Sequence, residues 1–152
     1  MKTFFMSLVD YDVWATKLLA KTMKTNGIHD SEIPVKGLNH MIYVNQMWYD
    51  RLVGKEMSLP KPPDYDFEGS LSHYLELMEA YKKLVEDANE GDLASKISYK
   101  NTKGLPFDNT MSEILFNVLN HGTHHRNGLS RFIRKSGYTP PPTDYIFYLR
   151  EK

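Results

Sequence analysis

The chain has 152 residues, a length typical of one domain built around a single hydrophobic core. Lys and Arg together number 19, and so do Asp and Glu, so the net charge gives no reason to expect binding to nucleic acid or to an anionic membrane surface. Because the chain has no Cys, disulfides, thiolate ligands and a cysteine nucleophile are excluded, and a metal site must use His, Asp or Glu.

The N-terminal region predicts an amphipathic helix over residues 3–24, because apolar side chains recur at intervals of three and four until Asn26-Gly27 ends the pattern. Asp10 and Asp12 interrupt its apolar run, which is unlike the core of a secretion signal. No apolar stretch approaches the ~20 residues that a membrane-spanning helix needs. We therefore expect a soluble, cytoplasmic protein that does not bind membranes.

A second amphipathic helix is predicted from near Pro34 to Val53, and His40 falls near its apolar face. Residues 55–69 contain several prolines and predict a long ordered loop, because proline cannot continue a helix. A third helix is predicted over residues 70–89, where apolar residues again recur with helical spacing.

The pattern changes between residues 93 and 109, where Ile97 and Tyr99 alternate with polar residues. Residues 101–104 are typical of a turn, and the chain after them can return as a second strand. Because Pro106 lacks an N–H donor, this second strand must be an edge strand. A short β-hairpin is therefore expected before the last long helix.

The fourth helix is predicted to begin after Thr110, which forms a capping box with Glu113, and to end before Gly137. The tail after residue 140 begins with consecutive prolines and ends with apolar residues, so we expect it to pack back on the body of the protein. Four such helices with long connections predict an all-α four-helix bundle, with residues 1–152 forming a single domain. This architecture often places metal and cofactor sites between facing helices.

The fourth predicted helix contains His121 and His125, which lie one turn apart on the same face. Two imidazoles at this spacing can bind one ion, although such pairs also occur by chance on helix surfaces. Their position beside the apolar stripe favours a metal site, because a buried imidazole needs a partner for each ring nitrogen. His124 points about 100° away and is interpreted as an outer or surface residue. By itself, His40 is better explained as a core histidine bonded to a carbonyl than as a third ligand.

Four segments carry motifs that are informative when taken in order: Tyr11-Asp12-Val13-Trp14-Ala15; Leu38-Asn39-His40 with Trp48 and Arg51-Leu52; Asn120-His121-Gly122-Thr123-His124-His125-Arg126; and the tail from Gly137 through Pro141-Pro142-Thr143-Asp144. This ordered set resembles the DinB/YfiT-like family of small four-helix metalloproteins over nearly the whole chain. Three positions depart from the family pattern. Asn127-Gly128 stands where Gly and Gln are common, and Asp12 stands where Asn is common.

The resemblance implies a bundle in which the second and fourth helices supply three histidines to a divalent metal ion. The matching positions in this chain are His40, His121 and His125. The resemblance also implies a homodimer that acts on a small-molecule substrate, and it gives no indication of nucleic-acid binding. Characterised members of the family include enzymes that require a low-molecular-weight thiol.

Three neutral imidazoles leave at least one coordination position open, as in catalytic zinc sites. A cation bound in this way can activate a thiol for S-transfer to a small electrophile, or it can activate water for hydrolysis. We expect zinc, although the ligand type is equally compatible with nickel, iron or copper. The resemblance favours thiol transfer, with a metal-dependent hydrolase as the alternative. A non-catalytic metal-binding or ligand-binding stress-response protein is a third hypothesis.

Several further residues are candidates for the surroundings of the metal or for the pocket. Asn120 and Asp144 are possible outer partners of the ligating imidazoles, or else cap, turn or solvated residues. Arg126 can bind a substrate carboxylate or form an exposed ion pair with an acidic neighbour. Residues predicted to line the mouth of the site, or otherwise to pack in the core, are Trp14, Tyr43, Met47 and Trp48.

Overall fold

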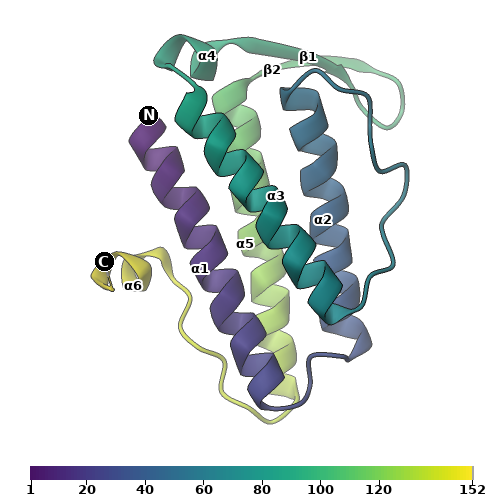
Figure 1. The fold of residues 1–152 in the computed structure, drawn as a ribbon, viewed down its shortest axis with the longest axis vertical. Coiled ribbons are helices and arrows are strands. Elements are labelled where there is room, and N and C mark those ends of the chain that lie inside the picture. Colours follow the sequence, from purple (N-terminus) through teal and green to yellow (C-terminus); the bar gives the residue numbers. More distant parts are fainter. Residues whose placement is uncertain (152) are drawn as a thin grey trace.

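In the computed structural model, which describes residues 1–151, four long helices form a bundle (Figure 1). The long helices are α1 (Lys2–Thr25), α2 (Glu32–Leu52), α3 (Phe67–Asp87) and α5 (Met111–Lys135). The shorter elements are α4 (Glu90–Ala94), β1 (Lys96–Lys100), β2 (Pro106–Thr110) and α6 (Tyr145–Arg150). The predicted all-α bundle with a hairpin before the last long helix is therefore confirmed.

Each long helix packs against two neighbours, since α1 and α2 both contact α3 and α5. The apolar stripes of the helices meet along the centre of this arrangement, where the side chains of Leu19, Leu38, Tyr74 and Ile114 are almost completely buried. Burial of one such side chain contributes roughly 1.5–3 kcal/mol, so this core accounts for the association of the helices. None of the described helices is both long enough and apolar enough to cross a bilayer.

Side-chain caps set the boundaries of two long helices. Thr110 accepts a hydrogen bond from the Glu113 N–H, and the Glu113 side chain accepts one from the Thr110 N–H, as the capping box predicted. The helix α3 begins earlier than expected, because Asp66 accepts a hydrogen bond from the Gly69 N–H and the following Phe67 side chain is buried.

The hairpin packs against α2 and α5, and the tail packs against α1. Strands β1 and β2 pair antiparallel, and Pro106 lies opposite Lys100 at the end of the ladder nearest the turn. The tail packs on α1 as expected, with the Tyr11 hydroxyl donating a hydrogen bond to the Thr143 carbonyl at 2.7 Å. Its last turn is the short helix α6, which the sequence pattern did not predict.

Candidate metal centre

Three histidines converge between α2 and α5. His40 comes from α2, and His121 and His125 come from successive turns of α5. Each residue offers a ring nitrogen, and these atoms all lie within 4.8 Å of one another. The Nε2 atoms of His121 and His125 are 3.0 Å apart, and the His40 ring centroid is 4.7 Å from that of His125. The structure therefore brings together the residues that the family resemblance implied as ligands.

The chemistry of this cluster fits a divalent cation. Within residues 1–151, the Nδ1 atom of His121 is buried without a hydrogen-bond partner, and its Nε2 atom is paired with the Nε2 atom of His125. A cation placed among the rings would receive a lone pair from each residue and would replace the contact between two imidazole nitrogens. Imidazole nitrogen is a preferred ligand of zinc, copper, iron and nickel.

The surroundings keep the two α5 imidazoles neutral. Partial burial, followed by the proximity of His121, His40 and His124, lowers the pKa of His125 to about 4. Partial burial, followed by the proximity of His40 and His124, also lowers the pKa of His121. Because the charged forms are disfavoured, the nitrogen lone pairs are available at neutral pH, and a metal ion need not displace protons to bind.

His124 lies on a different face of α5 from the cluster. It is exposed, and with Asn120, Arg126 and Asp144 it lines a cavity of about 440 Å³ bordered by α1, α5 and the tail. Asp144 is also the residue that precedes α6. These four candidate residues therefore share a cavity that is not lined by His40, His121 or His125, although the His124 ring packs edge to face against that of His125, with 5.4 Å between the ring centroids.

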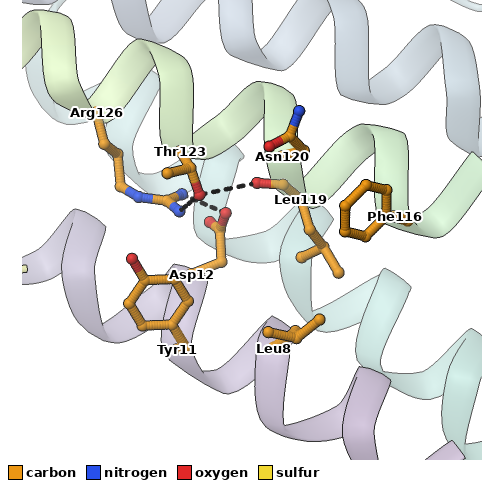
Figure 2. A pocket seen from close by; sticks show the side chains of 8 residues that line it. All are labelled: Leu8, Tyr11, Asp12, Phe116, Leu119, Asn120, Thr123 and Arg126. Carbon is orange, nitrogen blue, oxygen red and sulfur yellow. Dashed lines mark hydrogen bonds and ion pairs between the residues drawn. The ribbon is translucent and has the colours of Figure 1, made fainter. Parts of the chain in front are cut away.

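Arg126 occupies the interior between α1 and α5. Its guanidinium forms an ion pair and a hydrogen bond with the Asp12 carboxylate, and it donates a second hydrogen bond to the Thr123 hydroxyl at 2.9 Å (Figure 2). Tyr74 of α3 donates to the other Asp12 oxygen at 2.7 Å. The ion pair expected for Arg126 is therefore present, but it is buried rather than exposed, because α1 packs directly over this face of α5.

Gly122 allows this buried network to form. A Cβ atom at this position would lie 2.7 Å from a carboxylate oxygen of Asp12 and 3.0 Å from a guanidinium nitrogen of Arg126. The absence of a side chain thus lets α5 approach the ion pair closely. The sequence analysis did not identify the roles of Asp12 and Tyr74 in this network, because their partners come from distant parts of the chain.

The remaining candidates lie in two other environments. Trp14 packs against Tyr11 and Tyr148 and donates a hydrogen bond to the Glu151 side chain, so it belongs to the contact between α1 and α6. Tyr43 is partly buried on α2, one turn beyond His40. Met47 lines two cavities beside the hairpin.

The hairpin supplies an arrangement that the sequence analysis missed. The guanidinium of Arg51 lies over the Trp48 ring at 4.5 Å and over the Tyr99 ring at 4.6 Å. The rings of Trp48 and Tyr99 pack edge to face. Although alternation placed Tyr99 in a strand, only the docking of the hairpin on α2 shows which side chains it meets.

Comparison with known proteins agrees with the geometry. Residues 35–152 match the model of the DinB family. The chain is 26% identical over 166 residues to Protein DinB of Bacillus subtilis (strain 168), and this alignment covers 98% of the chain and 95% of that protein. The family match includes all three histidines of the cluster, His40, His121 and His125. On this evidence, the chain belongs to the DinB family.

Proposed function

We propose that the protein is a metal-dependent enzyme in which His40, His121 and His125 hold one divalent cation and activate a low-molecular-weight thiol for S-transfer to a small electrophile. The observation that supports this proposal is the convergence of three imidazole nitrogens from two helices within 4.8 Å. With three protein ligands, a cation keeps a coordination position open for a thiol or a water molecule and lowers the pKa of that molecule. Zinc is the proposed metal.

The histidines contribute through both their geometry and their protonation. Packing of α2 against α5 fixes the direction of approach of His40, while the helix backbone fixes the spacing of His121 and His125. Because burial depresses the pKa of His125, its imidazole stays neutral and cannot repel a bound cation at neutral pH. The cluster is not buried, so a small substrate can reach it from solvent.

The proposal is tested with protein purified without an affinity column that carries metal. We expect stoichiometric zinc by elemental analysis, and conjugation of chlorodinitrobenzene only when a thiol such as glutathione or mercaptoethanol is supplied. Turnover of nitrophenyl acetate with water alone, without thiol transfer, would instead identify a hydrolase. Metal binding without turnover of either substrate would identify a non-catalytic binding protein. In each assay, His125→Ala is the inactive control and His124→Ala is the matched control expected to retain metal.

The mass of the protein in solution tests a separate proposal, the homodimer implied by family membership. Light scattering at several protein concentrations measures this mass directly. A mass of about twice 17.7 kDa is the expected result.

A further inference from the structure

A positively charged and partly apolar site lies at the hairpin end of the bundle. Arg51, Lys55 and Lys100 line a cavity of about 440 Å³ together with Met47 and Tyr99. A neighbouring cavity of about 340 Å³ shares Arg51 and Tyr99 and adds the apolar side chains of Trp48 and Phe107. These cavities thus place cations beside aromatic surface.

The charge of Arg51 is not neutralised by the described part of the chain. Among residues 1–151, the Arg51 guanidinium donates one hydrogen bond, to the Lys100 carbonyl at 3.0 Å, and takes part in no ion pair. Burial is the main influence on this group and lowers the pKa of Arg51, so its charged form is partly desolvated without a carboxylate to compensate. An oxyanion bound to the free N–H groups would supply that compensation.

Two acidic side chains line the cavities in this region, and both already accept hydrogen bonds. Asp50 lines the larger cavity but is buried, and it accepts hydrogen bonds from the Gln46 amide and from both the N–H and the hydroxyl of Ser58. Glu113 lines a third cavity and accepts hydrogen bonds from the Thr110 N–H and the Asn109 amide. Within the residues that the structure describes, neither carboxylate forms an ion pair with Arg51, Lys55 or Lys100.

The third cavity shares Trp48 and Tyr99 with the hairpin site and extends the lining to α5. It has a volume of about 230 Å³ and is lined by Trp48 and Tyr99 on one side and by Asn117 of α5 on the other. Asn117 precedes His121 by one helical turn, so the two side chains lie on the same face of α5. His40 and Arg51 are eleven residues apart on α2, which corresponds to about 16 Å along the helix.

We propose that the cavities around Arg51 and Tyr99 bind the carboxylate or phosphate end of an elongated small substrate, whose apolar middle lies against Trp48 and whose reacting end reaches the three histidines. The part of this proposal that concerns the reacting end rests on the proposed function. The part that concerns the anion stands on the charges and the aromatic surface of the hairpin site.

The anion site is tested by fluorescence of Trp48 in a Trp14→Phe background, with benzoate and the neutral benzamide as probes. We expect benzoate to bind at least about tenfold more tightly than benzamide, because a hydrogen bond to a charged group is stronger than a neutral one. Arg51→Gln should remove this preference, and the exposed Arg134→Gln at the other end of the bundle should keep it. The Lys55→Gln/Lys100→Gln variant keeps the Arg51 side chain. It should bind benzoate more weakly than wild type does and should bind benzamide equally well. Equal binding of both probes, or an unchanged preference in Arg51→Gln and the double variant, overturns the proposal.

The connection to the histidines is tested by calorimetry on zinc-loaded protein. The ligands are linear alkyl hydroxamates of increasing length that end in either a carboxylate or its neutral amide. At one optimal chain length, we expect the hydroxamate that ends in a carboxylate to bind at least about tenfold more tightly than its amide counterpart, because both ends then bind simultaneously. The gain should disappear in Arg51→Gln and persist in Arg134→Gln.

The two proposals fail in distinguishable ways. If hydroxamates bind only with zinc and intact His121, but the carboxylate brings no gain at any length, the substrate proposal is wrong and the metal centre stands. A different result would be hydroxamate binding that needs neither zinc nor His121, together with benzoate binding that is tighter to wild type than to Arg51→Gln. In that case the proposed metal-dependent function is wrong and the anion site alone stands.

Discussion

Arg126 and Asp12 form an ion pair in the interior between α1 and α5, where their side chains are only 3% and 1% exposed. The pair joins α5 to α1, while His121 and His125 on the same helix converge with His40 of α2. One segment of α5 therefore contacts three other helices through adjacent residues. The ion pair connects this segment of α5 to α1, and the histidines of the same segment face α2.

Replacing Arg126 tests the contribution of the buried pair. Arg126→Met should lower the free energy of unfolding by about 3–5 kcal/mol, because the Asp12 carboxylate is left buried with only the Tyr74 hydroxyl as a donor. Denaturation with urea, followed by circular dichroism, measures this loss. The exposed Arg131→Met on the same helix is the matched control and should change stability by less than about 0.5 kcal/mol. Similar losses in both variants would contradict a specific role for the pair.

A side chain at Gly122 should disturb the same network. Gly122→Ala places a Cβ atom 2.7 Å from the Asp12 carboxylate, and the confined ion pair must shift. We expect a net loss of about 1–2 kcal/mol, since overpacking outweighs the better helix propensity of alanine. In Gly128→Ala, on the same helix, the new Cβ atom has no neighbour within 4 Å, so the substitution should stabilise the protein. Comparison of the two variants therefore separates the effect of overpacking from the effect of helix propensity. A stabilised Gly122→Ala would show that the network relaxes freely.

The metal centre makes a separate prediction for each imidazole of α5. His121→Ala and His125→Ala should each abolish stoichiometric zinc binding while leaving the helical content unchanged, because neither residue belongs to the buried apolar core. His124→Ala should retain the ion, since the structure places this side chain outside the cluster. Elemental analysis and far-ultraviolet circular dichroism are the measurements. Loss of helical content together with the metal would indicate a structural rather than a functional ion.

The depressed pKa of His125 predicts the pH dependence of the metal-free protein. In the unfolded chain this imidazole titrates near its ordinary value of about 6.5, whereas in the folded protein its pKa is about 4. Between these two pKa values the unfolded state binds more protons than the folded state. The free energy of unfolding therefore keeps its full value above a pH of about 6.5 and decreases as the pH falls toward the pKa of His125 in the folded protein. Nuclear magnetic resonance titration of the His125 ring gives the pKa directly. Wild type should lose stability relative to His125→Gln as the pH is lowered from about 6.5 toward 4, and urea midpoints that run parallel in the two proteins would contradict the shift.

Local sequence signals were sufficient for most of the helical framework. The capping box of Thr110 and Glu113 and the prolines between α2 and α3 act through nearby residues, so their effect can be predicted without knowing the fold. The same holds for the one-turn spacing of His121 and His125. The short helices α4 and α6 were missed because they are brief, and tertiary contacts such as the burial of Leu93 and Tyr148 accompany their formation.

The sequence by itself determined that this chain forms an amphipathic all-α bundle and that one turn of its last long helix presents two imidazoles on one face. Only the tertiary structure decided that His40 meets them, that Asp12 buries the charge of Arg126, and that Tyr99 covers Arg51. The physical reason is that helical periodicity depends on neighbours a few residues apart. Contacts between helices depend instead on which apolar faces pack together, and this packing is set by the whole chain at once.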